Sequence, residues 1–169
     1  IHWPCPGKDL YLDTWRALIR LREEGRARSI GVSNFQEPQL TRIIGETGVT
    51  PALNQVEINP RLQQPALRAF HDRHGIVTQS WTPLGQGHSF GAEPIRAAAR
   101  RTGRSPAQVI LRWHIQIGAA VIPRSTREAG LRENMALFDF ALTEAEMAGI
   151  ATLDEGVRCG PDPARFEMD

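Results

Sequence analysis

The 169-residue sequence predicts an α/β fold built on parallel strands. Short apolar runs alternate with segments of helical apolar period, about four times in succession, which is the order of a parallel sheet with helical crossovers. The composition, 41% hydrophobic and 23% charged, is that of an ordinary globular domain. Four to five such units make roughly half of a (β/α)8 barrel, whose usual length is about 250 residues. No Gly-x-Gly-x-x-Gly follows a strand, which disfavours a doubly wound sheet.

The predicted strands carry polar side chains at or near their carboxyl ends. They cover residues 29–34, 52–58, 76–81 and 119–123, and residues 1–4 are expected to be the end of a further strand running into a loop. In the first, Ile30 and Val32 suit a buried strand, and Gly31 permits close backbone approach. Ser33 and Asn34 follow directly. Because ligands of parallel sheets and barrels bind at carboxyl strand ends, we expect one polar rim facing one ligand.

Capping residues and early prolines predict where the helices between these strands begin. Such a cap or proline can satisfy or replace the unpaired N–H groups of a first turn. Further helices are expected over residues 94–102 and 106–117 and from near Arg127, with a loop over 83–94 between strand and helix. The expected start signals are Asp13, Pro38, Pro65, Ser105-Pro106 and Thr143, the last with Glu146 at capping-box spacing.

Charge and cysteine content exclude several classes of protein. The formal net charge is +1, which gives no case for nucleic acid or a membrane as the main partner. No apolar run approaches the roughly 20 residues of a membrane span, and no signal peptide is visible, so we expect a cytoplasmic protein. Cys5 and Cys159 are expected to be free thiols rather than a disulfide. The sequence begins without an initiator Met and without a helix or strand to lead in, so we expect the beginning of the domain to be missing.

Motifs in a characteristic order cover nearly the whole chain. They are Ile1-His2-Trp3-Pro4, Gly31-Val32-Ser33-Asn34-Phe35, Asn54-Gln55-Val56-Glu57-Ile58-Asn59-Pro60, Trp81-Thr82-Pro83-Leu84-Gly85, and Val121-Ile122-Pro123-Arg124-Ser125 followed by Arg132-Glu133-Asn134. With them the chain resembles the C-terminal part of an aldo/keto reductase, and most of all the bacterial 2,5-diketo-gluconate reductases. The resemblance implies the C-terminal portion of a (β/α)8 TIM barrel, which we place over residues 1–155. The stretch over 156–169 contains prolines and glycines and is expected to be a tail.

The resemblance implies hydride transfer from NADPH to an aldehyde or ketone, with a sugar-derived keto acid as one candidate substrate and a monomeric full-length protein. His2 matches the family's catalytic His, and a neutral imidazole there can donate to a carbonyl oxygen. Trp3 matches a residue of the substrate pocket. The Asp, Tyr and Lys of the family's catalytic tetrad have no match. Lys8 and Tyr11 follow His2 in the wrong order and are expected to be solvated loop residues, so the chain by itself is expected to be inactive.

The resemblance also implies a cofactor site spread along the chain. Hydroxyl and amide side chains suit the nicotinamide carboxamide, an aromatic face suits its ring, glycine-rich backbone suits the pyrophosphate, and Arg with Ser suits the adenosine 2′-phosphate. In that order, the matching residues are Ser33, Asn34 and Gln55; Trp81; Leu84, Gly85 and Gln86; Arg124, Ser125, Thr126 and Arg127; and, near the adenine, Glu133 and Asn134.

One position departs from the family's pattern. The family often has an Arg about six residues after the first cation, and this chain has Gly130 there. Either Arg127 or Arg132 compensates, or the grip on the 2′-phosphate is weaker. We therefore expect NADPH as the cofactor, with NADH as the alternative.

Two other interpretations compete with this hypothesis. The first is a non-catalytic nucleotide-binding or regulatory half-barrel, and the second is an unrelated α/β barrel. The presence of Asp, Tyr and Lys at strand ends upstream would decide for the enzyme. His71 and His74 lie on one predicted helix without a Cys or carboxylate to complete a ligand set, so we predict no metal site.

Overall fold

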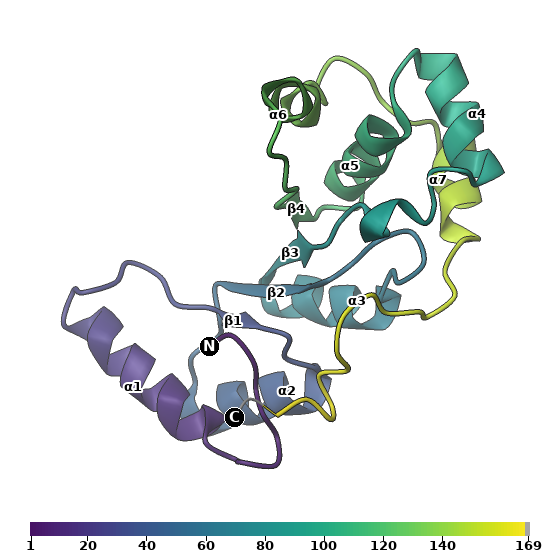
Figure 1. Cartoon of the computed structure of the whole chain (residues 1–169). Helices are drawn as coiled ribbons and strands as arrows, with labels where there is room; N and C mark the ends of the chain where they lie inside the picture. The colour runs from purple at the N-terminus through teal and green to yellow at the C-terminus, as the bar shows by residue number, and fades with distance from the viewer. Residues whose placement is uncertain (168–169) are drawn as a thin grey trace. The chain divides into compact units, whose positions relative to one another are not determined.

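The computed structural model describes residues 1–167 and shows alternating strands and helices (Figure 1). The helices are α1 (Tyr11–Glu23), α2 (Glu37–Thr47), α3 (Pro65–His74), α4 (Glu93–Thr102), α5 (Pro106–Gln116), α6 (Glu128–Met135) and α7 (Glu144–Ala151). The strands are β1 (Val32–Ser33), β2 (Leu53–Glu57), β3 (Val77–Trp81) and β4 (Ala120–Val121), with a short 3-10 helix η1 (Gly85–Gly87) after β3. Within the described residues these strands form one sheet in the order β1-β2-β3-β4. The predicted strand–helix alternation is confirmed.

The chain divides into two compact units. The first comprises Ile1–Val56, Pro65–Gln79 and the tail from Gly160, and the second comprises Glu57–Gln64 and Ser80–Cys159. Both β2 and β3 pass from one unit to the other along their length. Each unit is therefore described by itself.

The first unit packs helices against parallel strands. β1 and β2 pair in parallel, with Val32 opposite Asn54 and Ser33 opposite Gln55. Helix α1 packs on α2. Trp15 of α1 is fully buried, and its indole N–H donates to the carbonyl of Val49, just after α2, at 3.3 Å. The buried side chains of this unit include Trp15, Phe35, Leu40, Ile43, Val56 and Phe70. Burying each of them stabilises the fold by about 1.5–3 kcal/mol.

The amino-terminal residues extend the parallel pairing by one more segment. The Ile1 nitrogen donates to the Gly31 carbonyl at 3.1 Å, and the Ser33 N–H donates to the Ile1 carbonyl at 2.7 Å. Two bonds that flank Val32 in this way are the pattern of a parallel pair. Residues 1–4 therefore do run from a strand-like segment into a loop, as the sequence predicts, and His2 comes directly after the paired residue.

The first helix begins earlier than the sequence predicts. It starts at Tyr11, with Leu10 as an N-cap that has no side-chain bond, so the expected capping role of Asp13 is wrong. Asp13 lies in the first turn, where its negative charge is favourable, and pairs with Arg16 at 3.0 Å.

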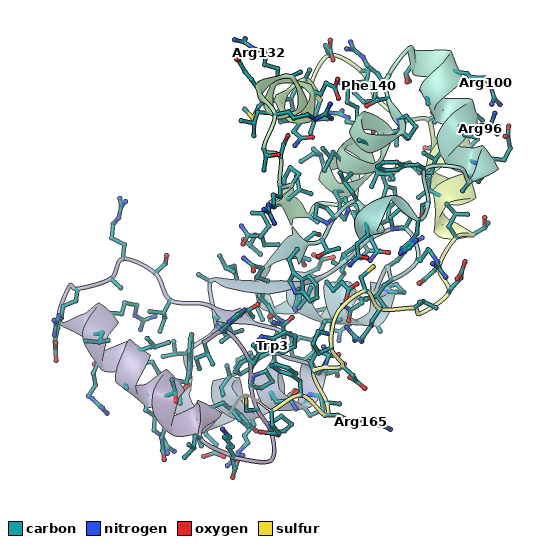
Figure 2. All side chains as sticks on the ribbon, in the orientation of Figure 1. Trp3, Arg96, Arg100, Arg132, Phe140 and Arg165 are labelled. Carbon is teal, nitrogen blue, oxygen red and sulfur yellow. The ribbon has the colours of Figure 1, made fainter. Side chains whose placement is uncertain are left out.

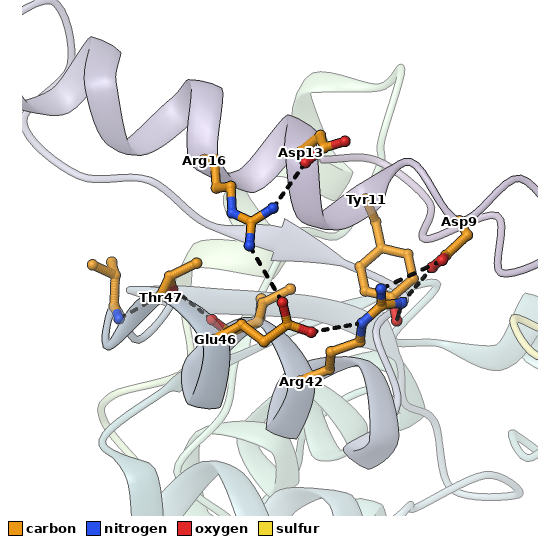
Figure 3. A network of polar contacts seen from close by, with 9 residues as sticks. Asp9, Tyr11, Asp13, Arg16, Arg42, Glu46 and Thr47 are labelled. Carbon is orange, nitrogen blue, oxygen red and sulfur yellow. Dashed lines mark hydrogen bonds and ion pairs between the residues drawn. The ribbon is translucent and has the colours of Figure 1, made fainter.

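Tyr11 is also not the solvated loop residue that we expected. It is 7% exposed, and its hydroxyl accepts a hydrogen bond from Arg42 of α2 at 3.0 Å (Figure 3). The same guanidinium pairs with Asp9 and with Glu46, which raises the Arg42 pKa above its ordinary value. The aromatic ring of Tyr11 meets Phe35 edge-on at 5.6 Å. Tyr11 is therefore a buried residue with partners at Phe35 and Arg42, whereas Lys8 is exposed in a turn.

Helix α5 forms the centre of the second unit. Its residues Val109, Ile110, Leu111 and Trp113 are at most 1% exposed, and α4, α6 and β4 pack around it. Two predicted N-caps of this unit, at the starts of α5 and α7, are confirmed by their hydrogen bonds. Ser105 forms a capping box with Gln108, and Thr143 forms one with Glu146.

The segment after α6 is held against α5 by side-chain amides. The Gln116 amide donates to the Leu142 carbonyl at 2.9 Å and accepts from the Leu142 N–H at 2.7 Å. The Gln108 amide donates to the Glu133 and Ala136 carbonyls at 3.3 and 3.1 Å. Among these groups, the carbonyl of Ala136, the C-cap of α6, lies where a helix leaves carbonyls without an intrahelical partner.

A matched pair of glycines tests the close approach of β1 to β2. A Cβ at Gly31 would lie 2.9 Å from the Leu53 carbonyl oxygen, which is backbone and cannot rotate away. We expect Gly31→Ala to lower the free energy of unfolding by about 1–3 kcal/mol. Gly45 is exposed inside α2 with no atom within 4 Å of such a Cβ, so Gly45→Ala is expected to raise it by about 0.5–1 kcal/mol. Urea unfolding of both variants decides, and a Gly31→Ala variant as stable as the unmodified protein contradicts the packing described.

Candidate cofactor-binding site

The carboxyl end of β1 and the middle of β2 bring three predicted site residues together in the first unit. The Ser33 hydroxyl donates to the Gln55 carbonyl at 2.7 Å. The Asn34 amide donates to the Ser33 hydroxyl at 3.1 Å and to the His2 carbonyl at 3.0 Å. Asn34 has φ +62°, a left-handed conformation that Asn tolerates better than most residues, and this turns the chain sharply at the strand end.

An open hollow in this unit exposes part of that polar rim. Its lining includes His2, Ser33, Gln55 and Gln79. The Gln55 amide donates to the Gln79 amide oxygen at 2.7 Å, so the two side chains orient one another. Hydroxyl and amide groups here supply both donors and acceptors, as a carboxamide ligand requires. Gln79 was not among the predicted site residues. Gln79 lies on the neighbouring strand β3, and the alternation of side chains along the strands could have indicated that it shares a face with Gln55.

His2 lines this hollow, and the next residue, Trp3, contacts the tail. The His2 side chain is exposed, and its ring centroid lies 5.9 Å from that of Trp3. Trp3, labelled in Figure 2, meets Phe166 of the tail at 4.4 Å between ring centroids. The Gly7 N–H donates to the Glu167 carboxylate at 2.7 Å. The tail therefore covers one side of the residue that the resemblance assigns to the substrate pocket.

Behind the rim, His71 of α3 lies between two polar residues of the strands. Asn54 donates to His71 Nε2 at 3.0 Å, and His71 Nδ1 lies 2.8 Å from the Thr78 hydroxyl. An Asn amide nitrogen can only donate, so Nε2 accepts and the proton resides on Nδ1. Burial disfavours the charged imidazolium and lowers the His71 pKa to about 4. The sequence placed His71 on a helix, but this polar cluster was not predicted.

Acid is expected to destabilise the fold through His71. Its pKa is about 4 when folded, against an ordinary 6.5, with Asp72 opposing and His74 adding to the shift that burial causes. The unfolded chain therefore takes up the proton first. The stabilising contribution is complete above about pH 6.5 and is lost as the pH falls toward about 4, at a cost of about 3 kcal/mol. Urea unfolding at about pH 7 and about pH 4.5 should show a larger loss for the unmodified protein than for His71→Gln, and equal losses would contradict this assignment.

In the second unit, the chain curls tightly after Trp81. Thr82, Gly85, Gln86 and Gly87 all have positive φ, between +49° and +84°. A β-branched residue rarely adopts such a conformation, so Thr82 is strained. Trp81 and Leu84 are half-buried, Gly85 is buried beside Asn59, and Gln86 is exposed.

A buried histidine supports this turn from α5. His114 Nε2 lies 3.0 Å from the Pro83 carbonyl oxygen, which can only accept, so Nε2 carries the proton and donates. The segment expected near a pyrophosphate is thereby fixed at Pro83.

Arg124, Ser125, Thr126 and Arg127 line one surface hollow of the second unit. Both arginines and Thr126 are exposed. The Ser125 hydroxyl accepts from the Arg127 N–H at 3.2 Å and donates to the Arg127 carbonyl at 3.1 Å, which closes a small turn. Two cations and a hydroxyl in one hollow are suited to a phosphate.

The structure also gives Gly130 a physical role. Gly130 is buried, and a Cβ at this position would overlap the Ser125 hydroxyl, so the glycine makes room for that side chain. Arg132, one of the two arginines considered as compensation, is bonded to Glu128 at 2.7 Å. Of the adenine pair, Glu133 is exposed, and Asn134 is half-buried beside Met135 and Phe138 at an apolar hollow.

Within residues 1–167, no group of three or more His, Cys, Asp or Glu side chains is placed to hold a metal ion. Over the same residues, every helix is too short or too polar to cross a bilayer.

Comparison with known proteins agrees with these observations. A profile described as the aldo/keto reductase family matches residues 1–155. The chain is 48% identical over 171 residues to methylglyoxal reductase DkgA of Yersinia pestis, covering 100% of this chain and 62% of that protein. It is 47% identical over 168 residues to an aldo-keto reductase of Mycobacterium sp. strain KMS, covering 99% and 61%.

Solved structures show the same likeness. The crystal structure of a Gox0644 variant in complex with NADPH matches with a TM-score of 0.96 and 46% identity, over 99% of this chain and 62% of that one. A Bombyx mori aldo-keto reductase in complex with NADP matches with a TM-score of 0.86 and 34% identity, over 94% and 57%. The chain thus spans about three fifths of the length of its relatives. The parallel α/β fold expected of part of a (β/α)8 barrel is confirmed, and the chain belongs to the aldo/keto reductase family.

Proposed function

We propose that the natural protein carrying this chain reduces an aldehyde or ketone with NADPH, and that this chain supplies most of the cofactor site. The observation that supports this most directly is the hollow of the second unit, where Arg124 and Arg127 are exposed around Ser125. NADPH differs from NADH by a 2′-phosphate, and two cations beside a hydroxyl match that group. Relatives crystallised with NADPH and NADP add support.

The described residues also fit the nicotinamide end of such a cofactor. Ser33, Asn34 and Gln55 would hold the carboxamide, because hydroxyl and amide groups provide the donors and acceptor that it needs. Trp81 offers a half-buried aromatic face for the ring. When bound, the cofactor supplies the hydride. His2 would donate a hydrogen bond to the carbonyl oxygen of the substrate, and Trp3 with Phe166 would line the pocket for that substrate.

The phosphate end of the site favours NADPH over NADH, although Gly130 replaces the expected Arg. Arg132 is bonded to Glu128, whereas no ion pair engages Arg124 or Arg127 in the described residues. We therefore assign the compensation to Arg127. The pyrophosphate would pass Leu84, Gly85 and Gln86, and the adenine would lie near Glu133 and Asn134.

The relatives indicate which substrates to try first. Several are named methylglyoxal reductases, so a small 2-oxoaldehyde is the first candidate and a sugar-derived keto acid is the second. We further propose that residues 1–155 form part of an aldo/keto reductase barrel, with a tail over 156–169 whose last two residues lie outside the described structure. We also propose that the natural protein is a monomer and is located in the cytoplasm.

The experiment is a pair of assays on the natural protein. Binding of NADPH and of NADH is followed by cofactor fluorescence, and turnover is followed as NADPH oxidation with methylglyoxal and with a keto sugar acid. We expect tighter binding of NADPH and carbonyl-dependent oxidation. Binding without turnover on any carbonyl would favour a nucleotide-binding protein without catalysis, and absence of binding would refute the proposal.

A further inference from the structure

We propose that His71 is a positioning residue for the nicotinamide end of the cofactor site, acting through Asn54 on the backbone carbonyl of Phe35. This inference rests on the proposed function. It concerns a helix residue behind the sheet rather than one of the polar residues that line the hollow. His71, Asn54 and Phe35 are each fully buried, and all three belong to the first unit.

Asn54 links the helix to the turn that follows β1. Its amide nitrogen donates to the Phe35 carbonyl at 2.8 Å and to His71 Nε2 at 3.0 Å. The two hydrogens of one NH₂ group are thereby both used. The amide oxygen of Asn54 is buried and accepts no hydrogen bond within the described residues. The orientation of this amide therefore depends on its two acceptors alone.

His71 can serve as an acceptor only in one protonation form. The proton must reside on Nδ1, which donates to the Thr78 hydroxyl at 2.8 Å. Thr78 is 5% exposed, so water does not readily replace it. A proton on Nε2 would instead face the Asn54 NH₂ group. The contact could then be kept only by reversing the amide, which would place its oxygen against the Phe35 carbonyl oxygen.

The anchored carbonyl is next to the predicted cofactor residues. Phe35 directly follows Asn34, whose left-handed φ of +62° makes the turn, and Ser33 comes before it. The start of this turn is held on β2, where the Asn34 N–H and the Ser33 hydroxyl both donate to the Gln55 carbonyl at 2.9 and 2.7 Å. Its end is held by Asn54. Loss of the acceptor at His71 leaves that end with a weakened anchor, and displaces groups that must lie within hydrogen-bond distance of a carboxamide.

The test compares two ligands in the natural protein. NADPH carries the nicotinamide, whereas adenosine 2′,5′-bisphosphate carries only the phosphorylated adenosine. His71→Leu is expected to raise the dissociation constant for NADPH about tenfold and to leave that for the bisphosphate within about twofold. His71→Gln should recover most of the NADPH affinity, because the Gln amide oxygen can occupy the place of Nε2 and accept from Asn54.

Two further variants separate positioning from general stability. Leu67 is buried on the same helix outside this cluster, so Leu67→Ala weakens the core without removing an acceptor from Asn54. It is expected to leave the ratio of the two affinities unchanged. If His71→Leu does not fold, Thr78→Val replaces it. That variant removes the acceptor of Nδ1, keeps His71, and should also weaken NADPH selectively.

The outcomes distinguish the two proposals. If the unmodified protein binds neither ligand, the proposed function fails. If it binds both, but His71→Leu and Thr78→Val leave NADPH affinity unchanged or weaken both ligands equally, the positioning role is wrong and the proposed function stands.

Discussion

Replacing His2 by Ala in the natural protein is expected to lower kcat for NADPH-dependent carbonyl reduction by about 10²- to 10³-fold. The His2 side chain is exposed at the hollow that Ser33 and Gln55 also line, so an imidazole N–H can reach a carbonyl oxygen there. Hydride addition places negative charge on that oxygen, and the donated bond strengthens as the charge develops. Steady-state kinetics with the best carbonyl substrate measure the effect.

His2→Ala is expected to change the reaction rate with little change in cofactor affinity. Asn34 contacts the backbone carbonyl of residue 2 rather than its side chain, so the bond at 3.0 Å survives in His2→Ala and cofactor affinity should remain within about threefold. His74→Ala is the matched control, because His74 is an exposed histidine of the same unit on α3. We expect the control to leave kcat unchanged. A His2→Ala enzyme with kcat within about threefold of the unmodified protein would remove His2 from the catalytic machinery.

The second large effect concerns cofactor preference. The double variant Arg124→Ala, Arg127→Ala is expected to raise the dissociation constant for NADPH by about 10²-fold or more, because each hydrogen bond to a charged group contributes about 1.5–3 kcal/mol. The dissociation constant for NADH should change little, since that cofactor lacks the 2′-phosphate. Titration with each cofactor measures the ratio of the two constants.

A control and a salt series sharpen this result. Arg132→Ala removes an exposed arginine of the same region that is already bonded to Glu128, and it should change NADPH affinity less than about threefold. NADPH affinity of the unmodified protein should also fall with ionic strength more steeply than NADH affinity. Equal weakening of both cofactors in the double variant would show that these arginines do not recognise the 2′-phosphate.

Features that depend on residues a few positions apart were predictable from the sequence. Ser105 and Thr143 were expected as N-caps, Thr143 with Glu146 three residues further on, and both caps formed. The reciprocal bond of Gln108 to Ser105 was not predicted. The start of α1 was not predictable in this way. Its first residue, Tyr11, is bonded to Arg42 of another helix, and a partner so distant in the chain cannot be identified from helical periodicity.

The candidate site likewise combines features that the sequence predicts with contacts that depend on folding. Ser33 and Asn34 could be placed at a polar edge from the sequence, because the carboxyl ends of parallel strands meet at one edge of a sheet. The register that sets Ser33 opposite Gln55, in the middle of β2, came from the structure. The motifs of these three residues also carry the family resemblance.

Only the tertiary structure showed what supports that site. The bond between Asn54 and His71 depends on strand–helix packing, the pair Gln55 and Gln79 depends on strand register, and the contact of Trp3 with Phe166 joins opposite ends of the chain. None of these follows from helical or strand periodicity, because periodicity assigns a side chain to a face but not to a partner. The sequence by itself thus determined the order of elements, the polar strand ends and the family, whereas packing and register decided which side chains orient them.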